Sequence, residues 1–255
     1  MPTKESDKFI ESNIFEGMTS ISALLNSDSN DRKINKILYN VHFRDKKPKQ
    51  LAFLRHRASE LDFELTEVSD SEIEKHTIGS SHGGVIAFCS ERAIPSLSIE
   101  NIAENGVYYM LEGIEDPYNF GYALRSIYAS GADGVILSPR NWMGAAGVVA
   151  RASAGASELL NLYISLPEDA IRLFKEKNYK VYAADKPNSV SIYDTDMKKP
   201  LFVIIGGEKR GNTKVVLDSS DKIIRIDYGR DFPAALSAAS AATIISFEVY
   251  RQNNK

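Results

Sequence analysis

Residues 201–211 read LFVIIGGEKRG, a run of five apolar residues followed by a loop that contains three glycines. A continuous apolar run of this length is typical of a strand that is covered on both faces, as strands of parallel sheets are. The second half of the chain has five more strand-like stretches: 107–111, 134–137, 160–164, 180–184 and 222–226. Helical periodicity lies between them, at 121–130, 167–178 and 236–251. This half is therefore predicted to be an α/β domain, with a mostly parallel sheet and flanking helices.

The first half alternates strands and helices on a smaller scale. Strands are predicted at 37–39, 63–68 and 84–89, and helices at 48–60 and 71–76. This alternation predicts a small α/β domain. Residues 90–104 contain Pro95 and show little periodicity, so we interpret them as a linker. The predicted domains are 1–100 and 101–255.

The composition is that of an ordinary globular protein, with 43% hydrophobic and 25% charged residues. Cys89 is the single cysteine, and the opening residues are polar. No apolar run approaches the roughly 18 residues that cross a bilayer. We therefore expect a cytoplasmic protein without a membrane span or a disulfide framework.

Two classes of site find no support in the motifs. No Gly-x-Gly-x-x-Gly follows a strand, and no Gly-x-x-x-x-Gly-Lys-Ser/Thr occurs, which disfavours a dinucleotide dehydrogenase or a P-loop enzyme. The four histidines lie scattered among charged segments without metal-ligand spacing. They are His42, His56, His76 and His82. No metal is expected.

Charge is distributed unevenly along the chain. The formal net charge of −3 argues weakly against a nucleic-acid partner, because phosphate binding depends on clustered Lys and Arg. However, the segment from Arg32 to Arg57 holds nine basic residues, and a strongly acidic segment follows it directly. The candidate nucleic-acid contacts are Lys46, Lys47, Lys49, Arg55 and Arg57. A merely solvated basic face is the alternative.

Three clusters in the second half carry candidate chemistry. In the first, a strand ends near Leu111, a turn follows at Asp116-Pro117, and a helix opens near Asn119 with Arg125 on it. Asn119 and Arg125 thereby approach the carboxyl edge of the sheet, where ligands of α/β sheets bind. Taken alone, the two residues also suit a helix cap and a solvated helix position.

The second cluster is the glycine loop of residues 206–211, and the third is the segment 233–243 with its many small residues. Glycine permits positive φ and close backbone approach, which suits a loop around a flat cofactor such as adenosine. A plain tight turn explains the loop equally well. Small residues over three helical turns also suit a tightly packed core or dimer helix.

In order and spacing, the three clusters resemble the three motifs of the SpoU (TrmH) family of RNA 2′-O-ribose methyltransferases. Asn119 and Arg125 match the first motif, the residues from Gly206 to Gly211 match the second, and Ile226 with Leu236 match the third. The first half is similar to an L30e-like substrate-binding domain, whose closing sequence corresponds to His82-Gly83-Gly84-Val85-Ile86-Ala87.

The resemblance implies a trefoil-knotted SPOUT fold, a homodimer, S-adenosylmethionine as cofactor, and rRNA or tRNA as substrate. It assigns the central catalytic role to Arg125, which Asn119 and Glu208 would orient. It assigns cofactor binding to Gly206, Gly207, Gly211, Ile226 and Leu236. No metal is implied.

One departure from the family pattern concerns its third motif. Ser237 stands where the family usually has asparagine, and a hydroxyl reaches less far than an amide. Ser237 is kept as a catalytic candidate. An RNA-binding pseudo-enzyme of the same fold is therefore the alternative function. A small-molecule methyltransferase is disfavoured by the basic segment.

Overall fold

The computed structural model describes residues 13–27, 32–77, 82–186, 188–207 and 210–254. The chain divides into two compact units. The described residues up to Ala93 and those of Trp142–Leu159 form the first unit, and the rest form the second. The predicted boundary at residue 100 stays a prediction. It assigned Trp142–Leu159 to the second domain, whereas these residues pack within the first unit.

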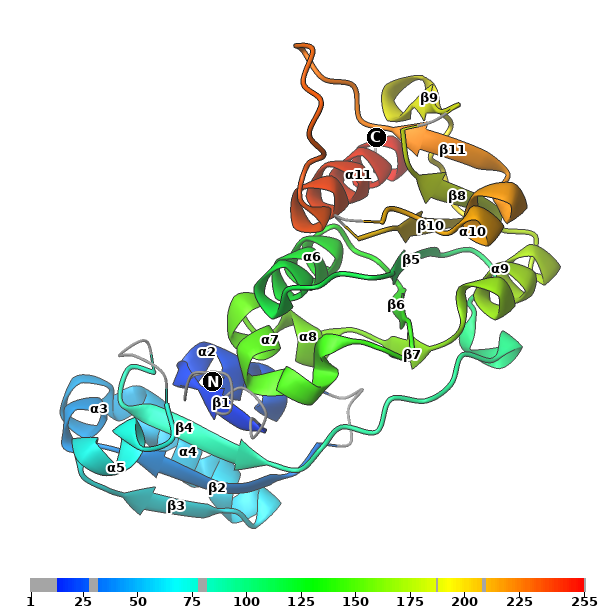
Figure 1. Cartoon of the computed structure of the whole chain (residues 1–255). Coiled ribbons are helices and arrows are strands. Elements are labelled where there is room, and N and C mark those ends of the chain that lie inside the picture. Colours follow the sequence, from blue (N-terminus) through cyan, green and yellow to red (C-terminus); the bar gives the residue numbers. More distant parts are fainter. Residues whose placement is uncertain (1–12, 28–31, 78–81, 187, 208–209, 255) are drawn as a thin grey trace, which may run out of the picture. The chain divides into compact units, whose positions relative to one another are not determined.

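The first unit is built on a four-stranded sheet of order β1-β4-β2-β3 (Figure 1). Only β2 and β3 pair in parallel. The strands are β1 Ile14–Glu16, β2 Ile34–Tyr39, β3 Glu64–Glu67 and β4 Val85–Cys89. The helices are α2 Gly17–Leu25, α3 Val41–Lys46, α4 Pro48–Leu61, α5 Asp70–Glu74, α7 Ala146–Ala152 and α8 Ala156–Leu159, with the 3-10 turn η2 Trp142–Ala145 before α7. The small α/β architecture agrees with the alternation in the sequence, while the L30e likeness stays a prediction.

Ion pairs hold the segment that carries α7 and α8 within the first unit. Arg32 contacts Glu158 at 3.1 Å, and both side chains are buried. Arg151 contacts Glu16 at 2.9 Å. Removing one partner of a buried pair leaves an uncompensated charge, so the Arg32–Glu158 pair favours the packing of this segment in the first unit. Arg32, the first residue of the basic segment, is therefore part of the interior and not of the charged surface.

The second unit is built on a seven-stranded sheet of order β7-β6-β5-β10-β8-β11-β9, and every neighbouring pair is parallel. This confirms the predicted parallel α/β sheet. The strands are β5 Val107–Leu111, β6 Gly134–Leu137, β7 Leu162–Ile164, β8 Lys180–Ala184, β9 Val190–Ser191, β10 Leu201–Ile205 and β11 Lys222–Arg225. The α-helices are α6 Pro117–Ala129, α9 Pro167–Glu176, α10 Lys214–Ser219 and α11 Ala238–Asn253, and the 3-10 turns are η1 Ile99–Asn101 and η3 Ile192–Asp194. The implied knot stays a prediction.

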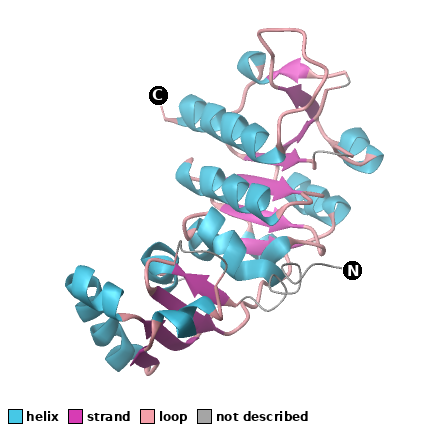
Figure 2. Cartoon of the chain, turned by 60° about the vertical axis from the view of Figure 1, so that its left-hand side comes forward, coloured by secondary structure: helices cyan, strands magenta, loops and turns pink. Residues whose placement is uncertain are grey.

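Helices cover both faces of this sheet, which explains the continuous apolar runs (Figure 2). On one face α9 packs through Phe174, whose ring stacks on Phe202 of β10 at 4.0 Å between centroids. On the other face α6 and α11 lie side by side, joined by a 2.6 Å hydrogen bond between Ser126 and Thr243. Strands β5 and β10 are buried along their whole length.

Some element boundaries differ from prediction. Helix α6 begins at Pro117, two residues before Asn119, because the Asp116 carboxylate accepts the Asn119 N–H at 2.8 Å and caps the helix. Helix α11 begins after Ser237, whose hydroxyl accepts the Ser240 N–H at 3.1 Å. The elements β1, β9, α2, α3, α7, α8 and α10 were not predicted. Each spans at most nine residues, and short segments carry little periodicity. No helix in the described part of the chain has the length and hydropathy to cross a membrane.

Candidate functional site

The second unit has a pocket of about 420 Å³ at the carboxyl ends of β8, β10 and β11. We call it the carboxyl-edge pocket. One wall is helix α11, whose residues at 238, 241 and 245 share a face at helical spacing. All five residues predicted to hold a cofactor line it: Gly206, Gly207, Gly211, Ile226 and Leu236. The structure thus brings these residues together, and their binding role stays a prediction.

Close backbone approach explains the glycines of the loop after β10. A Cβ on Gly207 would lie 2.6 Å from the Gly113 carbonyl carbon and closer still to its oxygen, and a Cβ on Gly206 would lie 2.6 Å from the Gly211 carbonyl oxygen. Gly211 itself has a φ of +59° and donates its N–H to the Gly207 carbonyl at 3.0 Å. The loop therefore folds back on itself and contacts the loop after β5. This close backbone approach requires glycine at these positions.

Tyr228 and Lys186 hold the loop between β11 and α11 in place. The Tyr228 hydroxyl accepts the Leu236 N–H at 3.1 Å. The Lys186 ammonium lies 5.0 Å from the centre of the Tyr228 ring and donates to the Ala234 carbonyl at 3.3 Å. A cation over an aromatic face is attracted by the ring quadrupole. These contacts hold Leu236 against the pocket, and both Lys186 and Tyr228 line it.

The catalytic candidates do not line this pocket within the described residues. Arg125 is exposed on α6 and has no ion pair in the described part of the chain. Asn119 is half-buried in the first turn of α6, and Ser237 is half-buried at the N-cap of α11. Glu208 lies outside the described residues. The contact between α6 and α11 places the two helices that carry Asn119, Arg125 and the N-cap Ser237 side by side.

The RNA-binding candidates lie on α3, on α4 and at the junction between them in the first unit. Lys46, Lys47, Lys49 and Arg55 are exposed and have no ion pair among the residues that the structure describes. We call these four the basic surface. Arg57 differs, because it is only partly exposed and donates to the Leu25 carbonyl and to the Glu60 carboxylate, each at 2.7 Å. Its contacts tie α4 to α2, so a role toward RNA would be added to a structural one.

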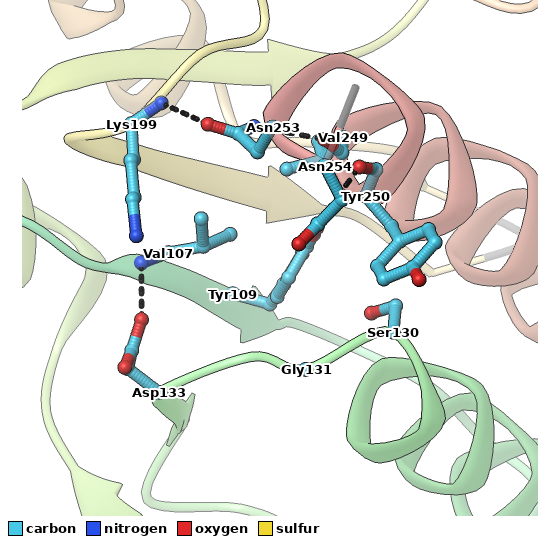
Figure 3. Close-up of a pocket in the computed structure, with 10 residues that line it drawn as sticks. All are labelled: Val107, Tyr109, Ser130, Gly131, Asp133, Lys199, Val249, Tyr250, Asn253 and Asn254. Carbon is cyan, nitrogen blue, oxygen red and sulfur yellow. Dashed lines mark hydrogen bonds between the residues drawn. The ribbon is translucent and has the colours of Figure 1, made fainter.

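A second, smaller pocket of about 180 Å³ lies at the opposite, amino edge of the sheet (Figure 3). There the Val107 N–H donates to Asp133 at 2.7 Å, and the Lys199 N–H donates to Asn253 at 3.0 Å. Tyr109 is fully buried, and its hydroxyl has no hydrogen-bond partner among the described atoms. No predicted site residue lines this pocket. In α/β sheets the carboxyl edge is the usual place for ligands, so the carboxyl-edge pocket is the candidate site.

Sequence reasoning missed five polar residues that line the carboxyl-edge pocket: Asp185, Lys186, Arg210, Arg225 and Tyr228. One signal could have found Asp185, because it follows directly after the buried strand β8 and so reaches the carboxyl edge. Tyr228 carried no such signal, since its place depends on the fold of the loop before α11. The described residues contain no group of three or more His, Cys, Asp or Glu that could hold a metal.

Glu112 follows β5 directly, next to the loop that touches Gly207. One of its carboxylate oxygens is buried without a hydrogen-bond partner in the described structure. Burial raises the pKa of Glu112 above its ordinary 4.5, and the nearby Glu168 raises the pKa further. Because the pKa of Glu112 is higher in the folded than in the unfolded protein, its carboxyl favours folding while it is protonated, below the pKa of the unfolded state. This contribution to the free energy of unfolding is lost as pH rises through the pKa of the folded state.

Glu112→Gln is therefore expected to raise the melting temperature at pH 8 and to leave it nearly unchanged at pH 4. The gain in free energy of unfolding should reach at most about 1 kcal/mol, because solvent screens a half-buried group. Thermal melting at both pH values measures the effect, with Glu91→Gln at an exposed position as the control. An equal shift at both pH values would show that charge is not the cause.

A family model described as "SpoU rRNA Methylase family" matches residues 106–247, which is more than half of the chain. Two staphylococcal proteins whose names place them in the TrmH family of tRNA/rRNA methyltransferases are similar to a little over half of the chain. The protein of Staphylococcus haemolyticus is 34% identical over 152 residues, covering 57% of this chain and 59% of the relative. The protein of Staphylococcus saprophyticus is 32% identical over 146 residues, covering 57% and 58%. The match spans less than two thirds of these relatives.

Solved structures match over nearly the whole chain. The AdoMet-bound rRNA methyltransferase from Sinorhizobium meliloti has a TM-score of 0.77 at 24% identity, covering 93% of this chain and 86% of that one. The SpoU methyltransferase AviRb from Streptomyces viridochromogenes, in complex with the cofactor AdoMet, has a TM-score of 0.77 at 18% identity, covering 98% of both chains. At these identities the likeness shows a shared fold.

Proposed function

Because the chain belongs to the SpoU rRNA Methylase family, we propose that it transfers the methyl group of S-adenosylmethionine to a ribose 2′-hydroxyl of rRNA or tRNA. One observation carries this proposal. The five residues that match the family's cofactor motifs come from two separate segments of the chain, yet all of them line the carboxyl-edge pocket. Names of similar proteins, which refer to tRNA/rRNA methyltransferases, support the substrate class.

The pocket suits the proposed cofactor in shape and chemistry. Its backbone cradle at Gly206 and Gly207 leaves no room for side chains, and Ile226 and Leu236 offer aliphatic surface to a flat adenine ring. When bound, S-adenosylmethionine supplies a methyl group that is electrophilic because it sits on a sulfonium. The chain therefore has to orient the acceptor hydroxyl and assist loss of its proton, and no metal is required.

We assign the central part of that work to Arg125. Its guanidinium is always charged and carries a planar fork of donors, which can stabilise negative charge developing on the 2′-oxygen and engage an RNA phosphate. Exposure on α6 leaves it accessible to a large substrate. Asn119 and Glu208 would orient it. Ser237 already caps α11, and its hydroxyl retains capacity for one further hydrogen bond.

We propose that the protein acts in the cytoplasm as a homodimer. Four aromatic residues are exposed on the two helices that cover one face of the sheet: Tyr122 and Tyr128 on α6, and Phe247 and Tyr250 on α11. Exposed apolar patches of this kind mark interaction sites. Arg125 lies three residues from Tyr122 and from Tyr128, so a partner on this face would border the proposed catalytic residue.

Incubation of the full chain with labelled S-adenosylmethionine and total RNA tests the function. The expected product is a 2′-O-methyl nucleoside, found by digestion and nucleoside analysis. If the labelled methyl group is found on a base, the proposed ribose specificity is wrong, and the proposed methyltransferase activity stands. RNA binding without any methyl transfer would identify a binding protein of the same fold instead.

Lys46, Lys47 and Lys49 of the basic surface are predicted to contact RNA phosphates. Changing all three to Glu should weaken RNA affinity at least about tenfold and lower the slope of log affinity against log salt by about 2, because fewer counterions are released. Cofactor affinity should not change. Lys198, Lys214 and Lys222 are exposed in the second unit, and their triple change to Glu is a charge-matched control. An unchanged salt slope would place the RNA elsewhere.

A further inference from the structure

Asp185 is a carboxylate in the carboxyl-edge pocket that the proposed mechanism does not use. It follows β8 directly, and β8 lies between β10 and β11 in the sheet. The loops after these two strands supply the residues that we assign to the cofactor. Asp185 therefore lies between the glycine loop and Ile226 at the edge of the sheet, and it lines the same pocket.

The carboxylate of Asp185 is held in place by backbone donors. One oxygen accepts the Lys186 N–H at 2.7 Å, and the other accepts the Asn212 N–H at 3.3 Å. The Asn212 side chain in turn donates to the Ala184 carbonyl at 2.7 Å, which fixes the donor. Each oxygen of an ionised carboxylate has room for about one more hydrogen bond, so two acceptor sites stay open.

Space beside the carboxylate depends on Gly211. A Cβ at this position would lie 3.0 Å from the carboxylate oxygen that accepts from Asn212, tighter than ordinary contact. The glycine thus leaves that oxygen uncovered. Asp185 also has no ion pair in the described structure, although Lys186 is its neighbour, because the Lys186 ammonium turns toward Tyr228 and the Ala234 carbonyl.

The other described residues along the pocket offer no second carboxylate as acceptor. They offer glycine backbone, aliphatic side chains, the Tyr228 ring and three cations, and Asp185 is the single carboxylate among them. The vicinal hydroxyls of a ribose are hydrogen-bond donors that need acceptors when they leave water. The hydrogen bonds that a carboxylate accepts are charge-assisted, and they are about twice as strong as hydrogen bonds between neutral groups.

We propose that Asp185 recognises the ribose of the bound nucleoside cofactor, by accepting hydrogen bonds from its 2′- and 3′-hydroxyls. This inference rests on the proposed function and adds a specificity residue to it. It predicts that the pocket discriminates against deoxyribose ligands, and that this discrimination depends on Asp185.

Calorimetry on the full chain tests the proposal with four ligands: S-adenosylhomocysteine, 5′-methylthioadenosine, and the 2′-deoxy and 3′-deoxy forms of 5′-methylthioadenosine. In the unmodified protein each deoxy ligand should bind about tenfold more weakly than 5′-methylthioadenosine. Asp185→Ala should weaken 5′-methylthioadenosine by a similar factor and should no longer distinguish the deoxy forms. Such coupling between a ligand group and a side chain is what a double-mutant cycle isolates. Asp218→Asn, a change on α10 away from the pocket, should leave all four affinities unchanged.

Three results would overturn the proposal. If Asp185→Ala weakens all four ligands equally, Asp185 only shapes the loop around Asn212. If Asp185→Ala weakens the binding of S-adenosylhomocysteine and not that of 5′-methylthioadenosine, the carboxylate contacts the ammonium of the amino-acid part of the ligand and not the ribose. If the unmodified protein binds none of the four, the proposed function itself fails, and this outcome is distinct from the first two because no variant is needed to see it.

Discussion

Arg125→Ala is expected to lower methyl transfer to RNA by about 100-fold or more, while the fold and cofactor affinity are retained. Removal of a positioned, charged hydrogen-bond donor that acts on the reacting oxygen lowers reaction rates by a factor of this size. Arg125 is exposed and has no ion pair in the described structure, so its removal should change stability by about 0.5 kcal/mol or less. Single-turnover rates with saturating cofactor measure the chemical step.

Arg125→Lys should not restore the rate, because a compact ammonium lacks the planar fork that engages two oxygens at once. Arg172→Ala provides the matched control, since Arg172 is an exposed helix arginine on α9, on the opposite face of the sheet. Its rate should equal that of the unmodified protein. Methylation by a folded Arg125→Ala variant at a near-normal rate would refute the assigned role and leave the family membership intact.

Gly207→Ala is expected to weaken S-adenosylhomocysteine binding by roughly tenfold to a hundredfold. The added methyl group would lie 2.6 Å from the Gly113 carbonyl carbon, and backbone cannot yield as a flexible side chain can. Overpacking of this kind costs about 1–3 kcal/mol, which corresponds to that range of affinity if the loop shifts to relieve it. Calorimetry with S-adenosylhomocysteine gives the affinity, and thermal melting shows whether the fold is also strained.

Gly229→Ala is the control for this variant. Gly229 lies in the loop between β11 and α11, its φ is not in the left-handed region, and a Cβ there would meet no atom within 4 Å. Cofactor affinity should be unchanged in Gly229→Ala. If Gly207→Ala binds as tightly as the unmodified protein, the loop after β10 is not the cradle of the cofactor.

Local patterns in the sequence were enough to predict the architecture of the second unit. Strands β5 and β10 are continuous apolar runs because both faces of the sheet are covered, and this requirement is visible residue by residue. The glycines at 206, 207 and 211 were also visible, although the sequence left a tight turn as an equal explanation. The structure adds a reason for Gly207 that no local pattern contains, because its close contact with Gly113 joins segments nearly a hundred residues apart.

The sequence by itself determined the α/β class and the parallel sheet, because hydrophobic periodicity is a local property of the chain. The residues assigned to the cofactor came from the resemblance of three short segments to the family's motifs. Only the tertiary structure decided which strands are neighbours, and with that the pocket between β8, β10 and β11 that includes Asp185. It likewise decided that Trp142–Leu159 pack in the first unit, where Glu158 neutralises Arg32. The physical reason is that strand order and buried ion pairs depend on contacts between distant segments, whose free energy no single stretch of sequence contains.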